Sequence, residues 1–379
     1  MLTLMELVVT VENPSKSRTV AVFDFGCGKK FELFIESDYV LSDLADPWLA
    51  LSLPLAMARG LDVRVLGRVS QSALESQVQV QKELLAGHPY MKQIRVFAEE
   101  VVSGLNPQTI VQDRQIGSFF SGGLDSTFTA LNLPKNSELI SVWGFDVPLS
   151  QSNHWEMTWN SIRKQALEFG KNSMMVKTNI RDMSDKFLDW GTEYNGAALA
   201  GIALALAPRF REVRIPGSYT NNYIVWGSFP TLDKSFSTDY LDIADHGLEV
   251  RIEKAQFVLK NHAMAALRVC WQNKQGLPNC GECSKCIRTR FECYWLGNGV
   301  FPEGLHGVPR LASVVKLNMS KGDYKFLKED LVWVRQNFGA SHLIYRFLFF
   351  LVFTKSQSRE NFLKLLPTGA RNLLARKFR

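Results

Sequence analysis

One stretch constrains the fold of this chain more than any other. Residues 116–119 favour a β-strand, Ser-Gly-Gly-Leu-Asp-Ser follows at 121–126, and a helix-forming segment comes directly after it. Gly122 and Gly123 let the backbone turn tightly because they have no Cβ. The amides of such a turn and of the first helical turn point at one spot, where the positive end of the helix dipole attracts phosphate. The stretch therefore predicts a strand–turn–helix unit that binds an anion; the alternative is a plain turn before an N-capped helix.

Side chains of the same stretch complete a phosphate site. Ser121 and Ser126 can donate hydroxyl hydrogen bonds to phosphate oxygens, and Asp125 can hold Mg²⁺ against them. A Walker A loop is excluded, because no lysine follows the glycines. The motif resembles the PP-loop, SGGxDS, of the N-type ATP pyrophosphatases. This resemblance implies that ATP is cleaved to AMP and pyrophosphate, with AMP placed first on a substrate oxygen. The implied ATP contacts are Ser121, Gly122, Gly123, Leu124, Asp125 and Ser126.

Strand and helix patterns alternate on both sides of the motif. Strands are expected at 61–66, 94–98, 116–120, 138–145, 173–178 and 212–215, and helices at 47–58, 70–85, 153–169 and 195–207. Such alternation predicts an α/β fold in which helices flank a parallel sheet. The PP-loop resemblance implies the adenine nucleotide alpha hydrolase-like form of that fold. We expect three parts: a β-rich segment at 1–44, the PP-loop domain at 45–298 and a helical, basic extension at 299–379.

The strand after the motif ends in Gly144-Phe145-Asp146. The carboxyl ends of neighbouring parallel strands share one crevice, so this strand end is expected beside the glycine loop. In the resembled family the corresponding strand end packs on adenine and ribose, which makes Gly144 and Asp146 predicted nucleotide contacts. A turn-forming aspartate is the alternative for Asp146.

Residues 219–247 interrupt the alternation with aromatic, amide and hydroxyl side chains. Long irregular segments in compact domains are often functional. A planar substrate could stack on Tyr223 or Trp226 and hydrogen-bond to Ser228 and Asp233. A surface loop with incidental aromatic residues is the alternative interpretation.

Two cations follow at the start of a predicted helix. Arg251 and Lys254 are placed to neutralise charge that develops on phosphate during adenylation. Together with Asp125 they form the predicted catalytic set. The alternative is a salt-bridged helix face that includes Glu253.

The second strong signal is a cysteine cluster with the spacing C-x9-C-x2-C-x2-C, at Cys270, Cys280, Cys283 and Cys286. Four thiolates at this spacing predict a tetrahedral, structural Zn²⁺ site that ties a loop and a helix to the α/β core. A [4Fe–4S] cluster is the competing interpretation. Cys293 is expected in the core and Cys27 as an isolated thiol.

The two motifs in this order resemble the QueC family, the 7-cyano-7-deazaguanine synthases. The resemblance covers about residues 115–297 and implies that a carboxylate, 7-carboxy-7-deazaguanine, is adenylated and then attacked by ammonia. This chain departs from a plain QueC in having long segments before the loop and after the cysteines. The segment at 226–233 is more similar to that of QueC-like proteins of bacterial defence operons (QatC and its relatives), which are thought to modify a macromolecule.

The composition of the chain limits which partners and which cellular location are expected. The net charge of +7 and the pI of about 9.0 suit an enzyme that handles ATP and permit an acidic partner such as tRNA. The first residues lack a basic signal-peptide region, and the apolar run at 343–353 is too short to span a bilayer. Clustered cysteines argue for metal rather than disulfides. We expect a cytoplasmic protein without membrane association, with ATP and a small carboxylate as substrates; a homodimer is compatible with these features.

Three functions stay open from the sequence. The first is a QueC-like ligase that transfers the activated acyl group to ammonia or to a protein amine, with a role in anti-phage defence. The second is a tRNA-modifying enzyme that adenylates a base, to which the basic tail at 355–379 could contribute. The third is a non-catalytic nucleotide-binding scaffold, against which the intact Asp125 and both serines count.

Overall fold

The computed structural model describes residues 6–26, 28–106, 110–218, 226–272, 274, 277–297, 299–306, 321–339 and 341. Cys27, Tyr223 and the basic tail at 355–379 lie outside the described residues. The strands are β1 (Glu6–Ser15), β2 (Arg18–Asp24), β3 (Lys30–Ser37), β4 (Asp62–Ser70), β5 (Val96–Val102), β6 (Gln115–Phe119), β7 (Glu138–Trp143), β8 (Asn172–Thr178), β9 (Phe210–Pro216) and β10 (Asp242–His246).

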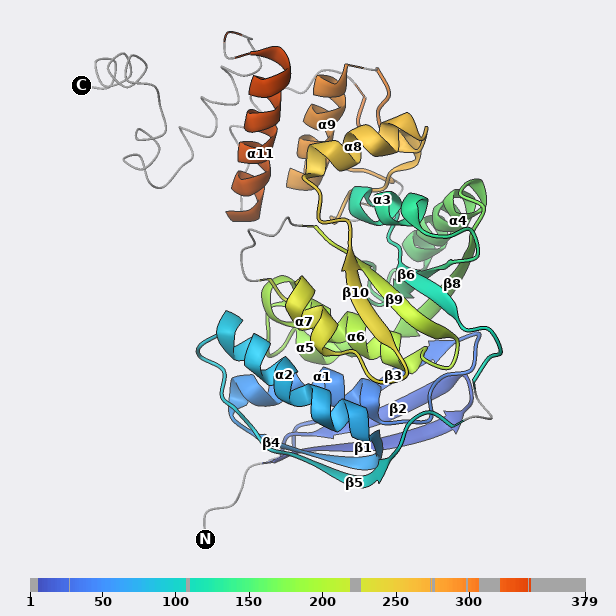
Figure 1. The fold of residues 1–379 in the computed structure, drawn as a ribbon, viewed down its shortest axis with the longest axis vertical. Helices are drawn as coiled ribbons and strands as arrows, with labels where there is room; N and C mark the ends of the chain where they lie inside the picture. The colour runs from blue at the N-terminus through green and yellow to red at the C-terminus, as the bar shows by residue number, and fades with distance from the viewer. Residues whose placement is uncertain are drawn as a thin grey trace, which may run out of the picture.

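The helices cover the sheet and one of its ends (Figure 1). They are α1 (Asp46–Arg59), α2 (Gln71–Gly87), α3 (Leu124–Asn132), α4 (Ser152–Glu168), α5 (Ile180–Ser184), α6 (Asn195–Ala205), α7 (Pro230–Ser235), α8 (Arg251–Lys260), α9 (Ser284–Leu296) and α11 (Lys321–Phe338), with a π-helical turn at Trp190–Tyr194 and a 3₁₀ turn at Met264–Ala266.

All ten described strands form one sheet in the order β10-β9-β6-β7-β8-β3-β2-β1-β4-β5. The pairs within β10-β9-β6-β7-β8 are parallel, and so are β1-β4 and β4-β5. This mostly parallel sheet with flanking helices confirms the predicted α/β class. β6, which leads into the glycine loop, lies between β7 and β9, so the loop emerges inside the sheet rather than at its edge.

Within residues 1–44, the described part contains the three strands β1, β2 and β3, which belong to the one sheet. β1, β2 and β3 pair in antiparallel fashion, and β3 continues onto β8 through the pairs Ile35–Thr178 and Ser37–Val176. β4, which follows residue 45, pairs with β1 and lies at the far side of the sheet from the loop. Strand pairing therefore joins the segments on either side of residue 45 instead of dividing them.

The described part of the segment at 219–247, residues 226–247, is more regular than its composition indicated. It contains α7 and β10, and β10 pairs with β9 in parallel. β10 is a short edge strand with a single fully buried apolar residue, Ile243, so its sequence gives little periodicity.

Small residues bring α6 and α1 into close contact. A Cβ at Gly201 would lie 2.8 Å from Cγ of Leu51, and the Tyr194 hydroxyl donates a 2.9 Å hydrogen bond to the Leu51 carbonyl oxygen. Leu51 and Tyr194 belong to a buried cluster that extends from β1 to β10. One core therefore supports both halves of the sheet.

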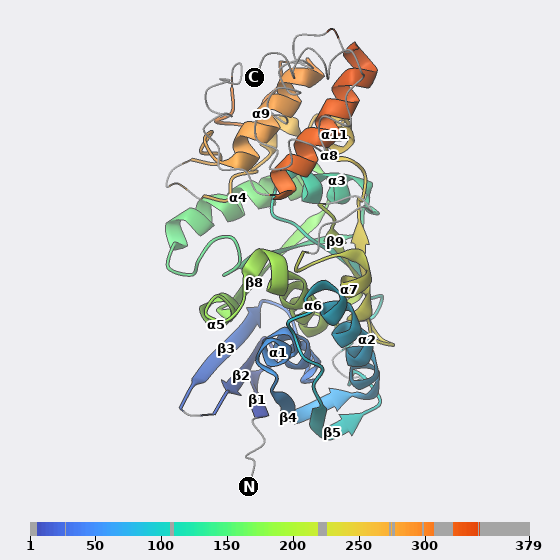
Figure 2. The ribbon, with the colours of Figure 1, turned by 90° about the vertical axis from the view of Figure 1, so that its left-hand side faces the viewer.

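α8, α9 and α11 lie together beyond the end of the sheet at which α3 begins (Figures 1 and 2). A second buried cluster links α3, α8 and the cysteine segment through Leu124, Phe128, Val258, Cys270 and Cys286. α11 is the described helix of the 299–379 extension, and it packs on α8 and α9. Among the described helices, none has the length and apolar character needed to cross a lipid bilayer.

Candidate nucleotide and metal site

The glycine loop forms a tight turn between β6 and α3. Gly122 has φ = +75°, a conformation that strongly favours glycine, and Gly123 is the N-cap of α3. The Ser126 hydroxyl donates to the Gly123 carbonyl oxygen at 3.1 Å and accepts a 3.4 Å hydrogen bond from the Ser121 amide. The predicted strand, glycine turn and helix start are therefore present in that order.

Asp125 lies in this turn between two buried cations. Lys254 Nζ is 2.9 Å from Oδ1 of Asp125, and Nη1 of Arg251 is 3.5 Å from Oδ2, which also accepts a 3.3 Å hydrogen bond from the Ser218 hydroxyl. Burial by itself would raise the pKa of Asp125, but the charges of Lys254 and Arg251 lower it to about 2. The structure thus brings together the three residues predicted as catalytic, and a Mg²⁺ ion at Asp125 would share its carboxylate with both cations.

A buried network of contacts holds Arg251 on the side that faces away from Asp125. Its Nε donates to Glu292 at 2.8 Å and its Nη2 to the Thr289 hydroxyl at 3.0 Å. On the α11 side, the Phe326 ring centroid lies 5.8 Å from the Arg251 guanidinium carbon. Burial and the negative charge of Glu292 raise the pKa of Asp330 well above its usual range, which favours its protonated form. Through these contacts, α9 and α11 position the cation that faces Asp125.

The end of β7 packs directly on the end of β8. Gly144 has φ = +111°, and a Cβ there would lie 1.8 Å from the Thr178 carbonyl oxygen. This close approach explains why a glycine is needed at position 144: a side chain would not fit against β8. Contact of the Gly144 backbone with a nucleotide stays a prediction. Asp146, two residues later, is exposed.

Three residues near the loop were not assigned to it from the sequence. The Arg268 amide donates a 2.8 Å hydrogen bond to the Gly122 carbonyl oxygen. Lys285, in the first turn of α9, carries a charge that contributes to the low pKa of Asp125. Ser218 follows β9 in a Pro-Gly-Ser turn, a small-residue signal at a strand end that could have identified it. Arg268 and Lys285 had no such signal, because they are separated from the loop by more than 140 residues of sequence.

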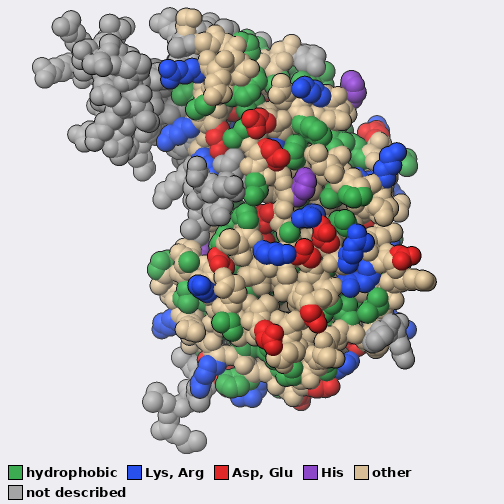
Figure 3. Space-filling model, viewed as in Figure 1, with side chains coloured by type: hydrophobic (Ala, Val, Ile, Leu, Met, Phe, Trp, Pro, Cys, Tyr) green, Lys and Arg blue, Asp and Glu red, His purple; other side chains and the backbone are tan. Residues whose placement is uncertain are grey.

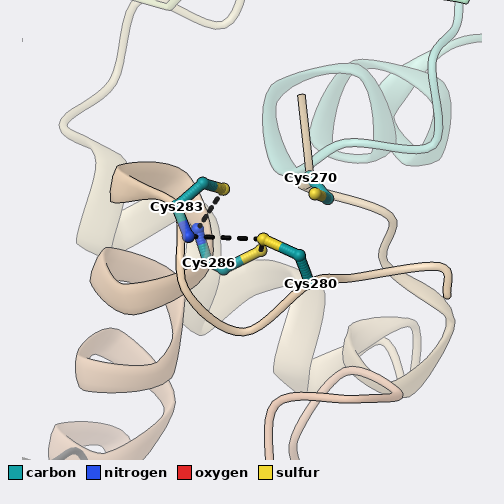
Figure 4. Close-up of side chains that lie close together, drawn as sticks. All are labelled: Cys270, Cys280, Cys283 and Cys286. Carbon is teal, nitrogen blue, oxygen red and sulfur yellow. Dashed lines mark hydrogen bonds between the residues drawn. The ribbon is translucent and has the colours of Figure 1, made fainter. Parts of the chain in front are cut away.

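The four predicted metal ligands come together. The Sγ atoms of the four cysteines all lie within 4.8 Å of one another. Figure 4 shows Cys280, Cys283 and Cys286 on one turn that leads into α9, with Cys270 on a separate segment that faces them. The cluster could hold a metal ion such as zinc, in agreement with the prediction.

Peptide groups around the cluster suit thiolate ligands. The amides of Glu282 and Cys283 donate to Cys280 Sγ at 3.4 and 3.3 Å, and the Cys286 amide donates to Cys283 Sγ at 3.5 Å. Such donors stabilise the negative charge that a set of four cysteines brings to a metal.

Asn279 fastens the Cys270 segment. This buried side chain accepts hydrogen bonds from the amides of Val269 (2.8 Å) and Cys270 (3.2 Å) and donates to the carbonyl oxygens of Leu267 (3.0 Å) and Glu303 (2.8 Å). Residues 267–270 are thus held on one side by Asn279 and the cysteine cluster. On the other side they are held by the glycine loop.

The residues predicted to bind the substrate do not form one surface in the described residues. Trp226 is partly buried, with ring atom Cζ2 3.4 Å from the position of a Cβ at Gly191. Ser228 donates a 2.6 Å hydrogen bond to Asp233, whose side chain is fully buried beside Asp245. Burial and the charge of Asp245 raise the pKa of Asp233 well above its usual range. Direct contact of Asp233 with a substrate would require this segment to move.

Comparisons with known protein families, with curated proteins and with solved structures find no match to this chain. The fold and the site define an α/β protein in which a glycine-rich loop and a four-cysteine cluster adjoin one another. Its function is therefore argued from the motif and from the contacts around it.

Proposed function

We propose that this protein is an ATP-dependent, AMP-forming ligase of the QueC-like family, with an adenine nucleotide alpha hydrolase-like fold. It adenylates the carboxylate of a deazaguanine-type substrate, releases pyrophosphate and transfers the acyl group to an amine, either ammonia or a protein amine. The observation that carries the proposal is the SGGLDS turn, whose Asp125 is kept ionised by two buried cations from α8.

In the first step, a carboxylate oxygen of the substrate attacks the α-phosphorus of ATP, and the bond to the pyrophosphate oxygen breaks. The amine then attacks the acyl carbon, AMP leaves with the bonding electron pair, and the amine proton passes to solvent. The loop amides and Ser121 hold phosphate oxygens, while Lys254 and Arg251 keep Asp125 available for Mg²⁺. The four cysteines would hold Zn²⁺ as a structural cross-link.

A pyrophosphate-release assay with ATP, Mg²⁺ and 7-carboxy-7-deazaguanine tests this function. Release should depend on the acid and should fall by at least about 100-fold in Asp125→Asn, which keeps the shape but loses the charge. Asp24→Asn is the matched control, because Asp24 forms an exposed ion pair with Lys30 at 3.0 Å in the N-terminal half of the sheet. Pyrophosphate release that is the same with and without the acid would rule out this substrate class.

The acceptor distinguishes the proposal from its alternatives. A tRNA acceptor would suit the net charge of +7, yet on the face shown in Figure 3 the basic side chains are interspersed with acidic ones. A gel shift with tRNA at low salt tests that alternative, because phosphate binding weakens steeply as salt rises. ATP binding without pyrophosphate release under any of these conditions would favour a nucleotide-binding scaffold. We place the protein in the cytoplasm, as a monomer or a homodimer, and in anti-phage defence as part of the same proposal.

A further inference from the structure

An arginine from the metal-binding segment lies against the glycine loop. The Arg268 amide donates to the Gly122 carbonyl oxygen at 2.8 Å, and a Cβ at Gly122 would lie 3.7 Å from the Arg268 Cβ. Only 7% of Arg268 is exposed. A guanidinium buried to this extent is costly unless anions surround it.

Two acidic groups attract the Arg268 guanidinium: the carboxylate of Asp146, which is exposed after the end of β7, and the thiolate form of Cys270, two residues further along the segment. The Arg268 backbone therefore contacts the glycine loop after β6, and its guanidinium is attracted by a carboxylate that follows β7. These are the two elements predicted to bind the nucleotide. The other buried cations near the loop, Arg251 and Lys254, already form ion pairs with Asp125, and Arg251 also with Glu292. Of these three buried cations, Arg268 is the one that is attracted by a carboxylate facing solvent.

The metal-binding segment fixes the position of this arginine. Asn279 holds the backbone on both sides of it, and Cys270 follows two residues later. Leu124 and Phe128 of α3 share a buried cluster with Cys270 and Cys286. Loss of the metal would thus loosen the segment that carries Arg268 and the helix that follows the glycine loop.

We infer that Arg268 is an anion-binding residue of the glycine-loop site, and that the cysteine cluster holds it there. On binding, its guanidinium exchanges Asp146 for oxygens of the pyrophosphate group of ATP. Arginine suits this role because its planar donors match two phosphate oxygens at once. The inference rests on the proposed nucleotide function. It adds Arg268 to the nucleotide site and makes anion binding depend on the metal, neither of which the loop motif implies.

Titration calorimetry of the full-length, metal-loaded chain with inorganic pyrophosphate tests the inference. Arg268→Gln should weaken pyrophosphate binding by about tenfold or more, the effect of losing a charge-assisted hydrogen bond, and Arg268→Lys should weaken it less. Asp146→Asn should strengthen it, because the competing carboxylate is gone. Arg290→Gln is the matched control in the same module, since Arg290 Nε donates to the Leu305 carbonyl oxygen, and its affinity should stay within about twofold of wild type.

Metal content and melting temperature are measured for each variant, and wild type is also titrated after chelation, when affinity should fall. Equal affinity of wild type and Arg268→Gln, both with metal bound, would overturn the inference while leaving the ligase proposal standing. Weaker binding in Asp146→Asn would also overturn it, because the carboxylate would then assist the anion. Pyrophosphate binding that depends on Arg268 in a protein that cleaves no ATP would uphold the inference and overturn the ligase. Absence of any pyrophosphate binding by wild type would overturn the inference, while the pyrophosphate-release assay decides the ligase proposal separately.

Discussion

Replacement of Lys254 by methionine should make the stability of this protein depend on pH in a new way. Lys254 is fully buried, and methionine has a similar length without the charge. The change leaves Asp125 with Arg251 at 3.5 Å as its remaining cation partner. Breaking a buried ion pair in this way costs about 3–5 kcal/mol of unfolding free energy at pH 7.

The pH dependence follows from the pKa of Asp125. In wild type this pKa is about 2, below the ordinary value of 3.8, so the ion pair contributes about 2 kcal/mol of stability. This contribution is complete above pH 3.8 and is lost as the pH falls through 2. In Lys254→Met, we expect the effect of burial to outweigh the remaining charge of Arg251 and to raise the pKa of Asp125 above 3.8. The variant should then lose stability as the pH rises through the new pKa. The stability gap between wild type and variant should therefore widen from pH 4 to pH 7.

Urea unfolding of both proteins at several pH values measures this gap. Asp125→Asn in the variant background should make the gap to wild type constant from pH 4 to pH 7, because the Asp125 carboxylate is then absent and the other titrating groups are common to both proteins. Lys30→Met serves as a control, because its ion pair with Asp24 is exposed and should be worth less than about 1 kcal/mol. A gap that stays the same from pH 4 to pH 7, or that stays below about 1 kcal/mol, would refute the reasoning.

Three further predictions test the surrounding structure. Burial raises the pKa of Asp245 to about 6, so wild type should lose stability as the pH rises from 4 to above 6. Asp245→Asn should reduce that loss. If the urea midpoint of the variant changed with pH in parallel with that of wild type, this prediction would be contradicted. Gly144→Ala should lower the free energy of unfolding by at least about 3 kcal/mol, because the new Cβ would clash with Thr178 and the backbone has a positive φ. A melting temperature within a degree or two of wild type would argue against this close packing of β7 on β8. Elemental analysis should find one zinc per chain, and chelation should lower the melting temperature; iron with a visible chromophore would instead support an iron–sulfur cluster.

The features that the sequence predicted well are local in the chain. The glycine turn, the strand before it and the helix after it depend on six consecutive residues and their neighbours. The four-cysteine cluster follows from spacing, because Cys280, Cys283 and Cys286 lie on one turn and a single distant ligand completes the set. Alternating strands and helices likewise predict a largely parallel sheet, whatever the order of its strands.

Only the tertiary structure decided which distant segments meet. Ile35 pairs with Thr178, so the N-terminal strands lie inside the sheet rather than before it, and no local pattern specifies that register. The partnership of Asp125 with Lys254 joins residues 129 positions apart, and its effect on the pKa depends on burial that only packing creates. Arg268 reaches the glycine loop for the same reason. A charged side chain acquires its partners, and therefore its chemistry, when the fold removes it from water.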